Sequence, residues 1–160
     1  MSALAERAPL PRDAVMTLTG LELMRAMIDG RLPGAPIAAV MNMRGISADL
    51  GTMMFEAIPG SEHYNPLGTV HGGFAATLLD SCMGCAVHTM LPAGVGYTSI
   101  DINITYVRAI TAATGPVTAR GEVINAGRRV ATARGTLTDA AGKVLAHGTT
   151  SCLVMPLAGA

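Results

Sequence analysis

Charged and aromatic side chains are scarce in this sequence. Of its 160 residues, 14% are charged and 3% are aromatic, tryptophan is absent, and the formal net charge is zero. Nucleic acids are held by basic grooves and stacked aromatic rings, so no nucleic-acid partner is expected. Half of the residues are hydrophobic. With so few charges to cover the surface, we expect a second copy of the chain to bury part of it.

Long apolar runs are missing as well. The N-terminal stretch contains prolines and charges where a signal peptide has a continuous apolar core, and no segment reaches the roughly 20 apolar residues of a membrane-spanning helix. The three cysteines cannot all pair within one chain, and free thiols are typical of a reducing compartment. We therefore predict a cytoplasmic protein that does not act in a membrane.

No cluster of residues has the spacing of a metal site. Cys82 and Cys85 form a C-x-x-C pair, but the pair falls inside an expected helix and not at its N-terminus, so we interpret both as packing residues. Too few further ligands lie near them to bind zinc. Neither a metal nor a cofactor is predicted.

One stretch of small and apolar residues, from Asn65 to Met90, dominates the sequence. It opens with an Asn-Pro turn, passes through the run His71-Gly72-Gly73 and then continues without proline, which predicts a loop that leads into a buried helix. At a helix N-terminus, paired glycines allow backbone N–H groups to approach a ligand closely, and the helix dipole favours negative charge there.

Between His71 and His88, Asp80 is the only acidic or basic side chain. The helix is apolar nearly all the way round, so we expect burial on every side. A lone buried carboxylate is costly unless it is paired or used, which makes Asp80 a catalytic candidate. The alternative is a carboxylate satisfied by backbone donors or a hydroxyl. Gly84 costs about 1 kcal/mol relative to alanine in a helix, so close packing against it is expected.

Further elements are expected on both sides of this helix. Residues 1–16 are predicted to form a flexible arm and residues 17–160 a single domain. Residues 19–30 predict a short helix that starts with a capping box, and residues 37–58 predict two strands. Four more strands are expected at 99–106, 117–124, 129–138 and 144–154, the first of them with the alternate residues Ile100 to Tyr106 facing a core. The result is an α+β fold, an antiparallel sheet of about six strands around one long helix.

A known family has a similar motif. Its members share the spacing of Asn65, Gly68, His71, Gly72, Gly73 and Asp80. The sequence thus resembles the hotdog-fold acyl-CoA thioesterases, in the branch of the phenylacetate-pathway (PaaI-like) enzymes, over roughly residues 17 to 155. The resemblance implies the hotdog fold, an acyl-CoA substrate, no cofactor beyond the coenzyme A of that substrate, and homodimers or homotetramers with active sites shared between subunits.

The same resemblance implies catalytic roles. Gly72 is similar to the backbone N–H donor to the thioester carbonyl, Asp80 to the general base or nucleophile, and Asn65 to a loop residue near the thioester or the attacking water. A Ser or Thr from the partner subunit is implied to position water, with Ser99 the better candidate and Thr98 the alternative. Eight residues of helix place Gly72 and Asp80 about 12 Å apart, which independently favours a shared site.

Other candidates surround this set. His71 is expected to brace the loop by hydrogen bonding, with a catalytic base as the alternative, and Gly73 to help bind substrate. Arg128 and Arg129, at an expected hairpin, suit the phosphates of coenzyme A because a guanidinium group forms paired hydrogen bonds to phosphate oxygens. A solvated turn is the alternative for both arginines.

Two other functions remain open from the sequence. Hotdog-fold hydratases or dehydratases also act on acyl thioesters, and the stretch NPLGTVH superficially resembles their signature, although no acid precedes Asn65 at the matching place. A non-catalytic acyl-CoA-binding module would keep the fold but would not need Asp80. The presence of Asp80 therefore favours thioester hydrolysis.

Overall fold

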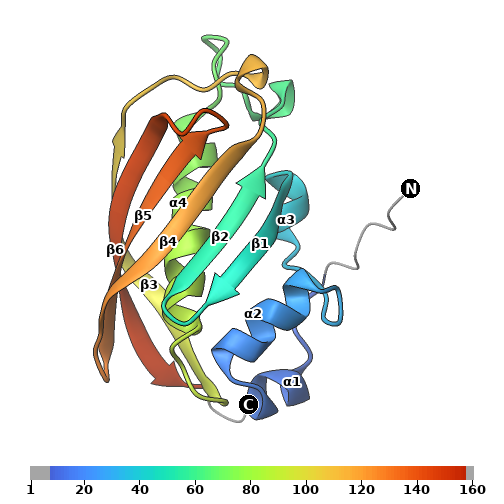
Figure 1. Ribbon diagram of the computed structural model, residues 1–160, viewed down its shortest axis with the longest axis vertical. Helices are drawn as coiled ribbons and strands as arrows, with labels where there is room; N and C mark the ends of the chain where they lie inside the picture. The colour runs from blue at the N-terminus through green and yellow to red at the C-terminus, as the bar shows by residue number, and fades with distance from the viewer. Residues whose placement is uncertain (1–7, 158–160) are drawn as a thin grey trace.

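A computed structural model describes residues 8–157 as one antiparallel sheet wrapped around one long helix (Figure 1). The predicted α+β architecture is confirmed. The helix is α4 (Gly72–His88), and the sheet has the order β1-β2-β4-β5-β6-β3. Its strands are β1 (Met43–Asp49), β2 (Thr52–Ala57), β3 (Val95–Tyr106), β4 (Val117–Ala126), β5 (Val130–Asp139) and β6 (Val144–Pro156).

Two sequence predictions near the N-terminus need correction. The expected flexible arm contains a helix, α1 (Arg12–Thr17), while residues 1–7 of that arm lie outside the described part. The expected strand from residue 37 starts only at β1, because α3 (Ile37–Val40) comes first. Pro36 precedes α3 with φ −55° and ψ −38°, and a proline preset to helical φ favours a helical turn.

The helix α2 (Gly20–Ile28) begins as predicted. Thr19 Oγ1 accepts the Glu22 N–H at 3.3 Å, and the Glu22 carboxylate accepts the Thr19 N–H at 2.8 Å, so the capping box is complete. Leu23 and Met24 are buried in a second core between α2 and the sheet. A Cβ on Gly20 would lie 1.7 Å from the backbone oxygen of His88, so α2 packs directly on the C-terminal end of α4.

The main core lies between α4 and the concave face of the sheet. Leu78, Leu79 and Met83 are fully buried there. Two glycines let the helix approach the strands: a Cβ on Gly121 would be 2.1 Å from a backbone oxygen of α4, and one on Gly135 would be 2.9 Å from Met83 Cγ. These close approaches were not predicted from the sequence. They fix the height of α4 above the sheet, and with it the position of every side chain on α4.

The edge strand β3 differs from its predicted form. Ile100 and Tyr106 are each 56% exposed and Ile102 is 43% exposed, so within one chain only Ile104 packs on the core as expected. A bulge between Ser99 and Asp101 shifts the register against β6. The extra residue lets Ser99 before the bulge and Ile104 after it face the same side of the strand. On the other edge of β3, no strand among residues 8–157 pairs with it.

Burial of α4 on every side is also not observed. Asp80 is exposed, and Gly73, Thr77, Ser81 and Cys85 are only partly buried. These residues recur three to four apart and form an open stripe along the helix. Further along, a Cβ on Gly84 would lie 2.6 Å from the ring of Tyr97, which confirms the predicted close packing.

No helix among the described residues is long and apolar enough to cross a membrane.

Candidate active site at the start of the central helix

The helix entrance leaves one backbone donor free. His71 is the N-cap of α4, and its Nδ1 accepts the Gly73 N–H at 2.8 Å. This is the bracing role expected for His71, and it commits the Nδ1 lone pair that a catalytic base would need. The Gly72 N–H, at the first helical position, has no hydrogen-bond partner among the described residues. Helix N-termini favour anionic groups, so this N–H can stabilise a developing oxyanion.

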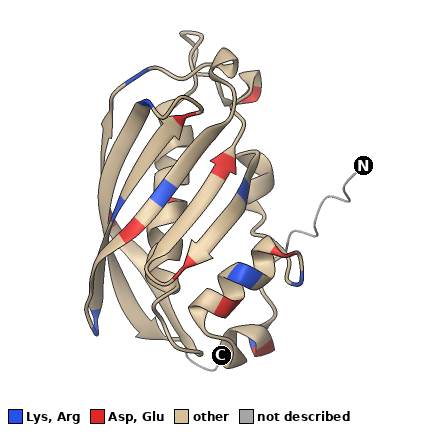
Figure 2. Cartoon of the chain, viewed as in Figure 1, with Lys and Arg blue, Asp and Glu red and all other residues tan. Residues whose placement is uncertain are grey.

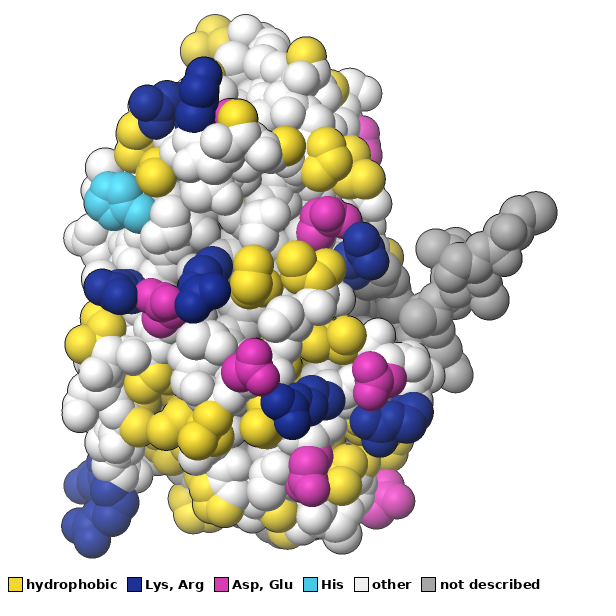
Figure 3. All heavy atoms as spheres, in the orientation of Figure 1, with side chains coloured by type: hydrophobic (Ala, Val, Ile, Leu, Met, Phe, Trp, Pro, Cys, Tyr) yellow, Lys and Arg dark blue, Asp and Glu magenta, His cyan; other side chains and the backbone are white. Residues whose placement is uncertain are grey.

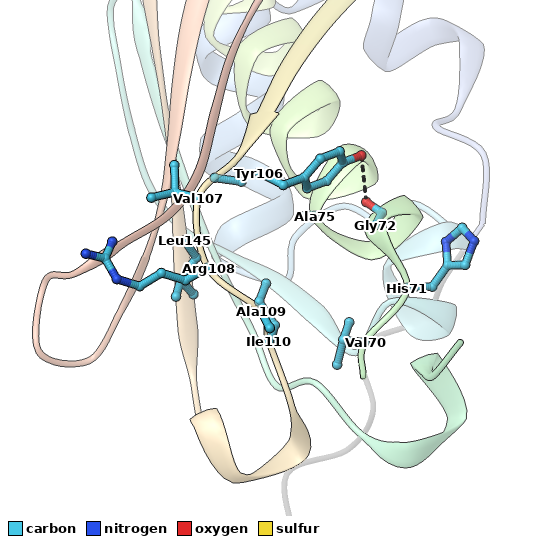
Figure 4. A pocket seen from close by; sticks show the side chains of 11 residues that line it. Val70, His71, Gly72, Ala75, Tyr106, Val107, Arg108, Ala109, Ile110 and Leu145 are labelled. Atoms are coloured by element: carbon cyan, nitrogen blue, oxygen red, sulfur yellow. Dashed lines mark hydrogen bonds between the residues drawn. The ribbon is translucent and has the colours of Figure 1, made fainter. Parts of the chain in front are cut away.

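Tyr106 is a site residue that sequence analysis missed. Its hydroxyl donates to the Gly72 carbonyl oxygen at 3.2 Å (Figure 4), and its ring lies 3.1 Å from where a Gly72 Cβ would stand. Any side chain at position 72 would therefore press on Tyr106. The two residues are 34 apart in sequence, and nothing local to β3 signals that contact.

Beside this contact is a cavity of about 250 Å³, which we call the entrance cavity. Apolar and small residues form most of its wall, among them Val70, Ala75, Ile110 and Leu145. Arg108 also lines it, but its side chain extends away from Gly72 (Figure 4). The free N–H of Gly72 thus adjoins an apolar space that could hold an uncharged group.

Asp80, in the middle of α4, pairs with Ser99 of β3. Ser99 Oγ donates to Asp80 Oδ1 at 2.7 Å. The β3 bulge turns Ser99 toward the helix, whereas Thr98 is exposed, so the geometry favours Ser99 over Thr98. The bond joins two residues of one chain, and the water-positioning role implied for a serine of the partner subunit stays a prediction.

Asn65 acts as a turn residue in this structure. Its Oδ1 accepts the Leu67 N–H at 2.8 Å, and its Nδ2 donates to Thr69 Oγ1 at 2.8 Å. Both ends of the side-chain amide are therefore used inside the loop, as in the structural alternative considered from the sequence. A contact of Asn65 with the thioester or water stays a prediction.

Arg128 and Arg129 lie far from the helix entrance. They follow β4 in the β4–β5 hairpin, at the end of the sheet opposite to the start of α4 (Figure 1). Both are exposed, and neither has an ion-pair partner among residues 8–157. Within one chain they do not join the Gly72 or Asp80 sites, so their contact with coenzyme A stays a prediction.

The thiols are packing groups. Cys82 and Cys152 are buried, Cys85 is partly buried, and all three are free. Burial raises the pKa of the Cys85 thiol to about 11, while the nearby Tyr97 hydroxyl opposes the shift; burial also raises the pKa values of Cys82 and Cys152. Thiols of this kind are poor nucleophiles at neutral pH. No group of three or more His, Cys, Asp or Glu side chains in the described part is arranged to hold a metal.

Comparison with known proteins places this geometry in a family. The sequence profile of the Thioesterase superfamily matches residues 67–146, half of the chain. The chain belongs to this superfamily. Human acyl-coenzyme A thioesterase 13 is 33% identical over 104 residues, which cover 64% of this chain and 73% of that protein. The resemblance inferred from the motif around Gly72 is thereby confirmed.

Two further comparisons agree. A protein of Halobacterium salinarum named as an esterase is 41% identical over 68 residues, and the match covers 41% of this chain but only 43% of that protein. The PaaI protein of the E. coli phenylacetic acid degradation operon superposes with a TM-score of 0.73 at 18% identity, covering 85% of this chain and 93% of that one. The last likeness shows the hotdog thioesterase fold. Together with the superfamily match, the human relative's name supports an enzyme that hydrolyses thioesters.

Proposed function

We propose that this protein hydrolyses acyl-CoA thioesters, with the Gly72 N–H polarising the carbonyl and Asp80 acting as general base or nucleophile. The observation that carries the proposal is the free N–H at the start of α4 combined with the 2.7 Å bond that orients Asp80 on the open stripe of the same helix. One oxyanion donor contributes about 10²–10³ in rate, and a positioned base about 10²–10⁴.

The active site is proposed to be shared between two chains. Gly72 and Asp80 are both in α4, about 12 Å apart along the helix axis, and a rigid helix cannot bring them to one carbonyl. Antiparallel association of two chains places Asp80 of one chain near Gly72 of the other. We expect sedimentation at micromolar concentration to show a dimer or tetramer and no species of 16.3 kDa. A fully active monomer would contradict the shared site.

Mixed oligomers test the sharing directly. Chains carrying Asp80→Asn are unfolded and refolded together with chains carrying Gly72→Pro, which lacks the N–H. In a shared site, half of the dimers are mixed and each mixed dimer has one intact site, so activity recovers to about a quarter of wild type. If each site uses a single chain, no mixed dimer has an intact site and activity stays at the level of the separate variants.

The reaction itself is tested with a panel of aliphatic and aryl CoA esters. Release of free thiol is followed for each ester, and hydration of an enoyl-CoA is followed by ultraviolet absorbance in parallel. Thiol release that depends on Asp80 supports the proposal and identifies the acyl class. Hydration without thiol release would instead establish a hydratase, and binding without either reaction would establish an acyl-CoA-binding module.

A further inference from the structure

A second cavity lies at the opposite end of α4 from Gly72. This distal cavity measures about 430 Å³, and aliphatic side chains of α4, the following loop and four strands form most of its wall. Those side chains are Val87, Leu91, Val95, Val123, Ala131 and Val154. Such a wall favours an apolar ligand, at about 25 cal/mol for each Å² removed from water.

Among residues 8–157, Arg128 is the only charged residue that lines the distal cavity. It is exposed and has no ion-pair partner among the described residues, whereas Arg120 and Arg134 share the Glu122 carboxylate at 2.8 and 3.0 Å. Figure 2 shows the hairpin tip as a basic position set apart from acidic residues. One free cation at the rim therefore offers a partner for a single anionic group.

The rim of the distal cavity is itself apolar. Met90, which lines the cavity, is 37% exposed, and Pro92 and Ala126 add further exposed apolar groups. Figure 3 shows hydrophobic side chains gathered toward the end of the molecule where the hairpin arginines project. The C-terminal end of a helix carries partial negative charge. A carboxylate here therefore requires the arginine, and a phosphate-rich nucleotide would leave the apolar wall unused.

We propose that the distal cavity binds a fatty acid, with the hydrocarbon tail along the aliphatic wall and the carboxylate paired with Arg128. The ligand has one charge and one long apolar chain, which matches one free guanidinium beside one apolar cavity. Binding at this site does not depend on the proposed hydrolysis. It can therefore be measured whether or not the protein is active.

The test is isothermal titration of the full-length protein with dodecanoate below its micellar concentration, with dodecanol as the uncharged analogue. We expect one saturable site per chain. Arg128→Gln should weaken dodecanoate binding by about fivefold, the upper range for an exposed ion pair, and leave dodecanol unaffected. Arg129→Gln is the matched control, since this neighbouring arginine does not line the cavity and its loss should change neither ligand.

The apolar wall is tested separately. Ala131→Phe fills the cavity and should abolish binding of both ligands, with the fold checked by thermal melting. If that variant does not fold, a series from octanoate to dodecanoate on the wild type serves instead, with affinity rising about fourfold per methylene. An affinity independent of chain length would overturn the proposal.

Two other results would also overturn it. Equal weakening by Arg128→Gln and Arg129→Gln would indicate attraction to the charge of the hairpin and no defined site. Displacement of dodecanoate by desulfo-coenzyme A would assign Arg128 to the nucleotide of the substrate.

Discussion

Gly72→Pro tests the proposed oxyanion donor by deleting one N–H. Gly72 is the first residue of α4, a position where proline is well tolerated because its nitrogen needs no intrahelical partner. His71 already has φ −61° and ψ 139°, the extended conformation that a following proline requires. The helix should therefore persist while the N–H that has no partner in the described part is lost.

Gly72→Ala is the matched control. A Cβ at this position lies 3.1 to 3.2 Å from Tyr106 Cζ, Cε1 and Oη in either variant, so both variants require a small shift of this 56% exposed side chain. Only proline removes the donor. The kcat of Gly72→Pro should therefore be about 10²–10³ lower than that of Gly72→Ala, or roughly 2.7–4 kcal/mol of transition-state stabilisation.

The assay is the initial rate of thiol release at saturating acyl-CoA, with circular dichroism to confirm that helix content is unchanged. Loss in kcat with little change in KM would place the interaction in the transition state. If folded Gly72→Pro and Gly72→Ala turn over at equal rates, the Gly72 N–H is not the oxyanion donor and the mechanism proposed above is wrong.

Three further predictions concern other parts of the chain. Asp80→Asn should lower kcat by about 10²-fold and Ser99→Ala by about tenfold. The double variant should have the same kcat as Asp80→Asn alone, because the serine acts through the carboxylate. If the kcat of the double variant instead falls by the product of the two single losses, the serine has an independent role. Burial lowers the pKa of His88 from its ordinary value of 6.5. As the pH drops below 6.5, the unfolded chain takes up a proton on this histidine before the folded chain does, so the free energy of unfolding should fall. The difference in unfolding free energy between urea melts at pH 5 and 7.5 should be smaller for His88→Phe than for the wild type. Gly121→Ala places a Cβ 2.1 Å from a backbone oxygen of α4 and should cost about 1–3 kcal/mol or more of unfolding free energy, whereas Gly34→Ala, with no atom within 4 Å, should be nearly neutral.

Features encoded locally were the predictable ones. The capping box at Thr19 lies within four residues, and the turn-and-glycine run before α4 gives both the start of that helix and the identity of Gly72. Helix caps and hairpin turns depend on residues close in sequence, so composition and spacing are sufficient to locate them. The family motif falls in this local stretch as well.

What the sequence could not provide depends on contacts between distant segments. The bulge beside Ser99 arises in the pairing of β3 with β6, and it decides that Ser99 rather than Thr98 meets Asp80. The alternation along β3 predicted that its apolar side chains face a core, but a single chain covers only some of them. Similarly, the Tyr106 contact with the helix entrance depends on where the end of β3 passes α4.

The exposed surfaces of one chain are related to the proposed chemistry. The free edge of β3 and the open stripe of α4 both carry members of the Asp80–Ser99 pair. A second copy joined antiparallel along β3 would cover that edge and run its own α4 in the opposite direction. Under such two-fold symmetry each helix start approaches the middle of the other helix. The proposed assembly thus brings together Gly72 and Asp80, which the rigidity of a single helix keeps about 12 Å apart.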